Sequence, residues 1–212
     1  MLVGKGALSF RTFLVGGKES APKNDRLLER LEQFAFAGIE ASEEGSVSGW
    51  IAPDHLFDGD FNMDKCFRGR YALFALRIDT RKVNATLLQA HTAIAIQAAL
   101  QEEGLEKLPG KRKREIKLEV KRQLLAETPP AQRAYGVFWN LRARKVYLQS
   151  TSKTVVEDFR AVFERTFELS LEPQVPGIQA ASYAREHDLL GALKDARPAS
   201  LAVTPRALAG AV

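Results

Sequence analysis

The sequence predicts an α+β protein in which mixed or antiparallel sheets pack with helices and an antiparallel helical hairpin projects at about residues 84–126. Segments typical of strands and of helices intermix without the regular rhythm of a doubly wound α/β fold. A stretch without Gly or Pro, 84–103, is followed by the seven-residue linker Gly104–Gly110 and a second helical segment, which suits a helical hairpin. We expect one region over residues 1–194 and a flexible Ala/Pro-rich tail over 195–212.

The N-terminal half is expected to begin with a strand over residues 7–15 that ends at a glycine pair. A helix capped by Asn24 or Asp25 should follow and end at Gly38, a natural C-terminal glycine. A short strand, Val47–Ile51, is closed by a proline. A polar acidic loop over 54–65 then leads into one long strand, Cys66–Ile78.

In the C-terminal half, the second helix of the hairpin is expected over 111–126, ended by a proline pair. Two strands, Arg133–Leu141 and Lys145–Ser150, should be joined by a basic turn. The patterning then predicts a helix, Ser152–Phe167, a strand, Leu169–Val175, and a short helix, Ser182–Leu193.

The charge of the chain is concentrated in one place. The 212 residues carry a formal net charge of +5, and the window Lys107–Arg122 holds eight basic and two acidic residues, a net +6. The rest of the chain is therefore close to neutral. One cysteine excludes an internal disulfide, three scattered histidines make a histidine-rich metal centre improbable, and no apolar run is long enough to span a membrane. With no signal-peptide pattern, we expect a cytoplasmic protein.

The basic window predicts a helix that contacts phosphate. At about 100° per residue, Lys113, Lys117 and Lys121 form a ridge. It lies between one apolar stripe, Ile116/Val120/Leu124, and a second, Leu118/Leu125. Like charges one turn apart repel unless an anion compensates them, and a phosphate backbone is the commonest such partner. A solvated surface helix remains the alternative, because Lys and Arg are good helix formers. The basic turn Arg142–Lys145 could extend the patch.

Other motifs offer weaker chemistry. The run Asp58-Gly-Asp60-Phe-Asn62-Met-Asp64 begins like a calcium loop, but the loop's glycine and its bidentate glutamate are missing. The same carboxylates could hold Mg²⁺ in a nuclease, although no catalytic Lys or Glu follows at a recognisable spacing. We expect no cofactor, no metal and no catalysis. His91 is expected to be a core or helix-contact histidine and Cys66 an inert buried thiol. Trp50 and Trp139 are expected in the core or at its rim, with base stacking on an exposed ring left open.

Several segments, in order, resemble the RdgC family of recombination-associated proteins. The family's G-W-V-P-P segment is similar to Gly49-Trp50-Ile51-Ala52-Pro53, and its basic helix with a leucine pair is similar to Gly110–Leu125. The family's W-I-D strand corresponds to Trp139-Asn140, and its A-S-A-K-x-A-E-D helix start to Ser150–Asp158. The resemblance covers about residues 7–176.

The resemblance implies a non-catalytic, nucleoid-associated protein that binds double-stranded DNA with little sequence preference. It further implies a homodimer or higher homo-oligomer, which forms a ring in the family, and competition with RecA in recombination. The residues that fall on the family's basic helix, and that we expect to bind nucleic acid, are Lys111, Arg112, Lys113, Arg114, Lys117 and Lys121.

The chain departs from the family's pattern at three places. A proline expected before the long helix is absent from Asp79–Asn84, and an Arg and a Phe expected after the leucine pair are absent from Ala126–Ala131. The family also runs roughly a third longer at its C-terminus. An alternative function therefore stays open: a self-assembling or partner-docking protein whose basic ridge meets an acidic protein surface.

Overall fold

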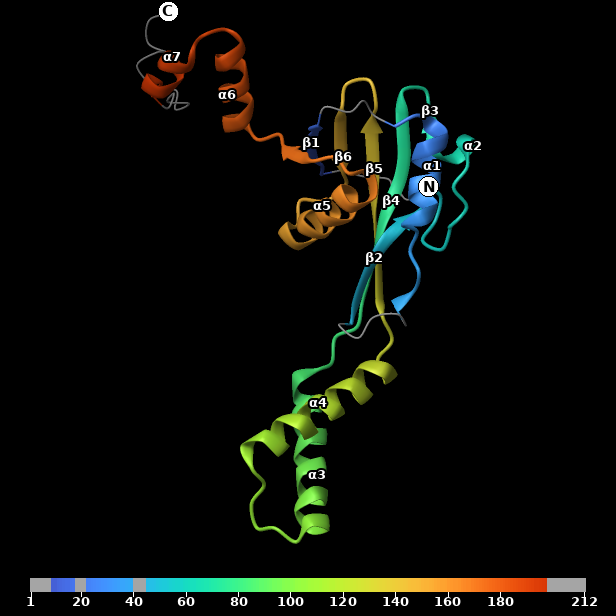
Figure 1. Cartoon of the computed structure of the whole chain (residues 1–212), viewed down its shortest axis with the longest axis vertical. Coiled ribbons are helices and arrows are strands. Elements are labelled where there is room, and N and C mark those ends of the chain that lie inside the picture. The colour runs from blue at the N-terminus through green and yellow to red at the C-terminus, as the bar shows by residue number, and fades with distance from the viewer. Residues whose placement is uncertain (1–8, 18–21, 40–44, 198–212) are drawn as a thin grey trace, which may run out of the picture. The chain divides into compact units, whose positions relative to one another are not determined.

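The computed structural model describes residues 9–17, 22–39 and 45–197 (Figure 1). Its strands form one seven-stranded sheet in the order β2-β4-β5-β6-β1-β7, with β3 paired to β4. The strands are β1 (Arg11–Val15), β2 (Ser46–Ile51), β3 (Phe67–Arg68), β4 (Tyr71–Thr80), β5 (Ala131–Asn140), β6 (Lys145–Leu148) and β7 (Leu171–Pro173). The pairs β2–β4, β3–β4, β4–β5, β5–β6 and β1–β6 are antiparallel. The predicted α+β class with an antiparallel sheet is confirmed.

One face of the sheet is covered by α1 (Asn24–Gln33) and α5 (Lys153–Phe167), which bury their apolar faces in the main core. Trp50 and Trp139 are fully buried there among the phenylalanines of α5. Trp50 Nε1 donates to Thr166 Oγ1 at 2.8 Å, so the polar atom of this large side chain keeps a partner inside the core. Both tryptophans are core residues, and neither presents a ring for base stacking.

The chain after α1 follows the edge of the sheet. The helix ends at Gln33, five residues before Gly38, so the predicted end at that glycine is wrong. Instead, Phe36 N donates to Trp50 O and Trp50 N donates to Phe34 O, so this segment bridges to β2. The bonds to β2 satisfy Phe34 O and Phe36 N, two backbone groups of a segment that is half-buried against the edge of the sheet.

The predicted long strand Cys66–Ile78 is interrupted. Residues Met63–Cys66 form a helical turn, α2, capped by Asn62, whose side chain accepts from Lys65 N. The two-residue β3 then turns back at Gly69, whose φ of 59° lies in the left-handed region that favours glycine. The apolar and aromatic residues of this segment predict one strand, but the chain turns at Gly69 and pairs β3 with β4 as a hairpin.

Two helices, α3 (Ala85–Glu103) and α4 (Gly110–Glu127), lie where the sequence predicts them. Asn84 caps α3 by accepting from Thr86 N and Leu87 N, and Gly104 ends it in the left-handed conformation. The two helices share a second apolar cluster, separate from the main core, built on Ala99, Leu108, Ile116, Val120 and Leu124. Their projecting antiparallel arrangement stays a prediction.

A second compact unit begins at Pro173. It contains α6 (Pro176–Glu186) and α7 (Leu190–Asp195) rather than the single short helix predicted, because the chain breaks at Asp188, where φ is 56°. The predicted tail lies mostly beyond Arg197, outside the described residues. Within the described part of the chain, no helix combines the length and the hydrophobicity needed to cross a bilayer.

Candidate nucleic-acid interface

The helix α4 has one face fixed by packing. Ile116, Val120 and Leu124 lie within about 80° of arc on the helix and are all buried against α3. This stripe sets the rotation of the helix, and with it the direction in which every other side chain of α4 points. The first of the two apolar stripes predicted from the sequence is therefore the contact with α3.

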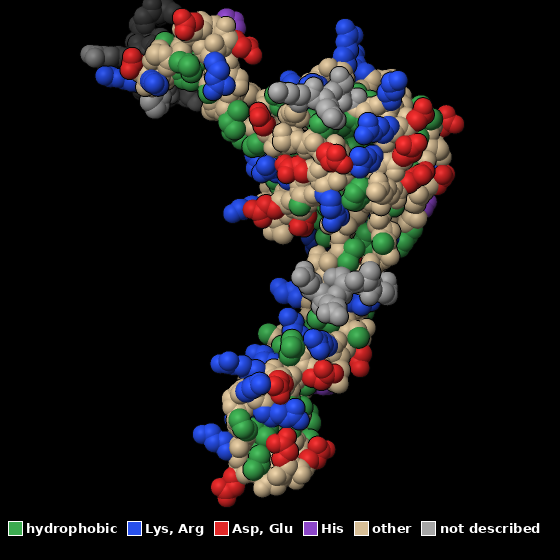
Figure 2. Space-filling view, in the orientation of Figure 1, with side chains coloured by type: hydrophobic (Ala, Val, Ile, Leu, Met, Phe, Trp, Pro, Cys, Tyr) green, Lys and Arg blue, Asp and Glu red, His purple; other side chains and the backbone are tan. Residues whose placement is uncertain are grey.

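From the line of the buried stripe around to the opposite side of the helix, α4 carries a set of cations that we call the basic flank. Among the described residues, none of its members takes part in an ion pair. Four members are exposed and the fifth, Lys113, is half-buried. Figure 2 shows Lys and Arg side chains gathered along the left-hand side of the part formed by α3 and α4. The basic flank consists of Lys111, Lys113, Arg114, Lys117 and Lys121.

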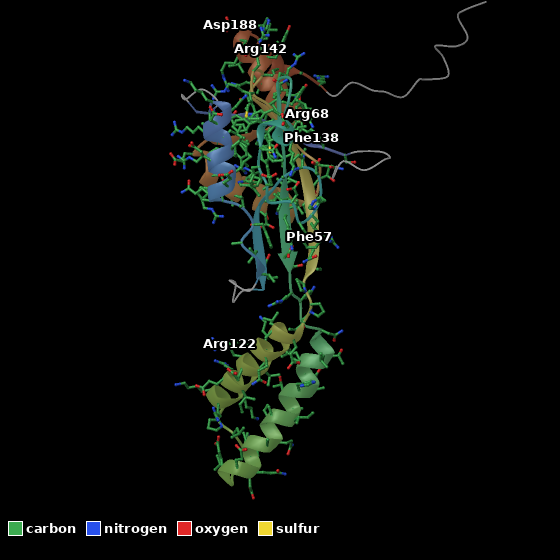
Figure 3. The ribbon with its side chains drawn as sticks, turned by 90° about the vertical axis from the view of Figure 1, so that its right-hand side faces the viewer. Phe57, Arg68, Arg122, Phe138, Arg142 and Asp188 are labelled. Atoms are coloured by element: carbon green, nitrogen blue, oxygen red, sulfur yellow. The ribbon has the colours of Figure 1, made fainter. Side chains whose placement is uncertain are left out.

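The other side of the stripe is electrostatically different. Arg112 Nε lies 3.2 Å from Glu103 Oε1 of α3, and its Nη1 lies 3.7 Å from Glu115 Oε2. Arg122, labelled in Figure 3, lies 4.0 Å from Glu119. A groove between the two helices on this side is lined by Glu102, Glu115 and Glu119. The structure thus separates Arg112 from the five other residues that were predicted to bind nucleic acid.

The second predicted apolar stripe is not buried as the first is. Leu118 is 52% exposed and Leu125 is half-buried. Leu118 lies among the cations of the basic flank, so the surface offered to a ligand is basic with an apolar centre.

The basic turn between β5 and β6 contains one cation with a structural role, Arg144, and two exposed cations, Arg142 and Lys145. Arg144 adopts a φ of 53°, and its guanidinium donates to Val15 O and Gly17 O, which ties the turn to the end of β1. Arg142 and Lys145 are exposed. The extension of the basic patch through this turn therefore cannot use Arg144 in the way the sequence suggested.

The acidic loop is organised around a lysine. Lys65 Nζ donates to Asp58 Oδ2 and Asp60 Oδ2, each at 3.0 Å, so an ammonium group sits where a bound cation would bridge the two carboxylates. Burial alone would raise the pKa of Asp58, but the bonds from Lys65 and from Asp60 N outweigh it and lower that pKa. Bonds to Asp60 and Asp58 raise the pKa of Lys65. No cluster of the described residues has the three His, Cys, Asp or Glu side chains needed to hold a metal ion.

Two other candidates resolve in different ways. Cys66 is fully buried, and burial raises its thiol pKa to about 11, so it is the inert thiol expected from its sequence context. His91 is exposed on α3, so its predicted place in the core or at a helix contact is wrong. The prediction relied on the apolar residues one helical turn from His91. Because α3 has apolar residues around most of its circumference, such neighbours occur on its exposed side as well as on its buried side.

Sequence reasoning missed two surfaces. The outer side of α3 exposes Leu87 and Ile94, the latter 68% exposed, and no Asp, Glu, Lys or Arg occurs between Lys82 and Glu102. This run without charged residues is the sequence signal that could have predicted an exposed apolar surface on α3. The second surface joins Arg68 and Arg70 to the β5–β6 turn, since Leu141 N donates to Arg70 O. Reading the long strand without its hairpin hid this pairing.

The comparison with known families gives one match. The family described as "Putative exonuclease, RdgC" matches residues 12–203 of the 212. A search of curated proteins found no match. The matched range includes the whole sheet apart from Arg11, all the helices described above and the entire basic flank. This chain therefore belongs to the RdgC family.

Proposed function

We propose that this protein is a non-catalytic DNA-binding protein that holds the phosphate backbone of duplex DNA on the basic flank of α4. The observation that carries the proposal is the set of five cations on one side of a single helix, with no ion pair to any described residue. Their mutual repulsion is relieved when phosphates replace condensed counterions. Membership of the RdgC family supports a role in recombination, in the cytoplasm and associated with the nucleoid.

The same geometry supports binding without sequence preference. Lysine is a flexible point charge, and four of the five members of the basic flank are lysines. Contacts from such side chains to phosphate fix the position of a duplex but carry no sequence information. Arg112, held by two glutamates, contributes less than the other five residues of the predicted set.

Charge reversal tests the proposal. The variant Lys113→Glu/Lys117→Glu/Lys121→Glu should bind a labelled duplex at least about tenfold more weakly than the unchanged protein at low salt. A matched variant, Lys23→Glu/Arg26→Glu/Lys153→Glu, changes the net charge equally at exposed sites in the first turns of α1 and α5, where glutamate suits the helix dipole. Equal losses in both variants would mean that net charge, not α4, controls binding.

The absence of catalysis is part of the proposal and needs its own test, because the family's description names an exonuclease. Three carboxylates could have served a Mg²⁺ nuclease, those of Asp58, Asp60 and Asp64, and the first two are bonded to Lys65. We expect no degradation of linear or nicked duplex with or without Mg²⁺. Magnesium-dependent cleavage that is lost in Asp58→Asn would contradict this.

Self-association is a second candidate function, and the outer side of α3 favours it. The part of α3 before Glu102 carries no charged side chain and exposes Leu87 and Ile94, and a contiguous exposed apolar surface is typical of protein–protein contacts. A homodimer, a closed ring and competition with RecA all belong to this proposal. Solution mass measured for the unchanged protein and for Ile94→Glu tests it: we expect a dimer that dissociates in the variant. A monomer at all concentrations would contradict self-association, and a large assembly indifferent to DNA would favour the partner-docking alternative over DNA binding.

A further inference from the structure

The face of the sheet that α1 and α5 do not cover carries a row of aromatic side chains. In the strand register, Leu73 lies opposite Phe138, Phe138 opposite Tyr147, and Tyr147 opposite Thr12. These residues alternate with the buried residues of the main core, so they point to the second face. Tyr71 occupies the same face, two residues before Leu73.

This second face is covered only in part. Arg77 Nη1 donates to Leu56 O, and its guanidinium lies 5.0 Å from the ring centre of Phe57, so the segment after β2 covers the end of β4 that carries Arg77. Leu73 is buried, whereas Phe138 and Tyr147 are half-buried and Phe10 is 38% exposed. The covering is therefore incomplete over β5, β6 and β1, and also over Tyr71 at the start of β4, which is half-buried.

The exposed part forms a continuous surface that we call the aromatic face. The rings of Phe10 and Phe138 pack at 5.7 Å with an interplanar angle of 78°. Beside them, Gly136 is buried, and a β-carbon there would stand 2.8 Å from Gln149 Oε1 and 3.5 Å from Phe138 Cε2. The ring of Phe138 thus leans over the glycine along the strand. The aromatic face consists of Phe10, Tyr71, Phe138 and Tyr147.

A set of exposed cations, which we call the basic turn cluster, lies at one end of the aromatic face. It occupies two neighbouring turns, and Figure 3 shows Arg68, Arg142 and Phe138 toward the same end of the sheet. No Asp or Glu occurs anywhere in residues 65–78 or 140–156, the two stretches that contain these turns. Among the described residues, no ion pair uses a member of the cluster. The cluster consists of Arg68, Arg70, Arg142 and Lys145. Within it, Nη1 of Arg68 also donates to Asp64 O and Phe67 O.

From this juxtaposition we infer that the aromatic face and the basic turn cluster bind a single strand of DNA, by base stacking and by phosphate contacts respectively. Every base has an apolar face that can stack on a Phe or Tyr ring, and such stacking tolerates any sequence. A duplex keeps its bases paired inside and cannot use this surface. An acidic peptide would satisfy the cations but gains little from the rings. This site is separate from the basic flank of α4, and the inference does not depend on the duplex binding proposed above.

The test compares labelled oligothymidylate with a labelled duplex, each of about 30 nucleotides or base pairs, by fluorescence anisotropy on the full chain. Phe138→Leu keeps an apolar side chain but removes the ring. It should weaken single-strand binding about fivefold or more and leave duplex binding unchanged. Tyr147→Leu should act in the same direction, whereas Tyr147→Phe, which keeps the ring, should retain binding. The thermal midpoint of each variant shows whether it is folded.

The cations have a matched control. Arg68→Ala/Arg142→Ala should weaken single-strand binding and lower its salt slope by about 1.4, since each lost phosphate contact on a single strand contributes about 0.7. Lys23→Ala/Arg26→Ala removes the same charge from exposed positions around the start of α1 and should change neither quantity.

Three results would overturn the inference: unaltered single-strand binding in folded Phe138→Leu and Tyr147→Leu, equal losses for single strand and duplex, or tighter binding of an RNA strand of the same length than of DNA. The α4 charge-reversal variant separates the two proposals. If this variant keeps duplex binding, the proposed function fails. The inference about single-strand binding is then still decided by the variants of Phe138, Tyr147, Arg68 and Arg142.

Discussion

At the scale of single residues, Gly49 shows how closely the chain passes β2. A β-carbon there would stand 2.6 Å from Phe36 Cα and 2.8 Å from Phe36 N, both backbone atoms. The contact cannot relax by a side-chain movement. The glycine is therefore required for the segment after α1 to bond to the edge of the sheet.

We predict that Gly49→Ala lowers the free energy of unfolding by about 1–3 kcal/mol, because overpacking forces the backbone at Phe36 to move. Denaturant unfolding checks this. Gly59→Ala is the matched control, since nothing lies within 4 Å of the added carbon and the backbone there is not left-handed. Equal effects of the two substitutions would contradict the account.

Cys66 gives a prediction about pH. Its thiol pKa is raised to about 11 by burial, whereas the ordinary value is 9.0. The unfolded chain therefore loses this proton first as pH rises, so stability should fall as pH rises through the window from about 9 to about 11. In the Cys66→Ala variant this component of the fall should be missing. At pH 8 the native thiol should resist iodoacetamide and react only after denaturation; rapid alkylation of the folded protein would contradict its burial.

At the scale of elements, β4 holds a buried ion pair. Arg77 donates from Nε to Asp79 Oδ1 at 2.8 Å and from Nη2 to Asp79 Oδ2 at 2.7 Å, and its guanidinium lies 4.1 Å from the ring centre of Phe36. Both side chains are more than nine-tenths buried. The pair links the second face of β4 to the segments on either side of β2.

We predict that Arg77→Met alone destabilises the protein by about 3–5 kcal/mol, because Asp79 is left as an uncompensated buried charge. The double variant Arg77→Met/Asp79→Asn should recover part of that loss. Thermal or denaturant unfolding of the two single variants and the double variant measures the coupling. Strict additivity of the two substitutions would contradict the pairing.

The sequence predicted the elements whose signals are local. The helix α3 has a capping asparagine, no internal breaker and a C-terminal glycine, and it lies within one residue of the prediction. Elements defined by contacts distant in sequence were predicted wrongly. The end of α1 is decided by β2, and the hairpin at Gly69 depends on a backbone conformation that strand patterning does not reveal.

In the candidate site, too, the features that depend on local sequence were predicted and those that depend on distant contacts were not. The spacing of the lysines predicted the basic flank and its buried stripe, because both depend on one helical period. Arg112 was grouped with the lysines because its partner Glu103 lies on another helix and is distant from it by nine residues. The aromatic face was missed because its residues come from three strands and from Phe10 just before β1, and only the register brings them together.

At the scale of the whole molecule, the separate apolar clusters predict separate stabilities. The cluster between α3 and α4 shares no buried residue with the main core. We predict that Val120→Ala speeds amide hydrogen exchange throughout residues 85–127 while β4 stays protected, because the two helices can open without the sheet. Exchange followed by mass spectrometry checks this. Faster exchange in β4 to the same degree would show one cooperative unit instead.

The proposed function has a chain that is nearly neutral outside one window bind duplex DNA through the basic flank of α4. The most direct measurement is the slope of the logarithm of the duplex binding constant against the logarithm of salt concentration, for the unchanged protein and for Lys113→Gln/Lys117→Gln/Lys121→Gln. Each lost phosphate contact should lower the magnitude of the slope by about 0.9, so the account predicts a decrease of about 2 to 3. An unchanged slope with unchanged affinity would contradict it.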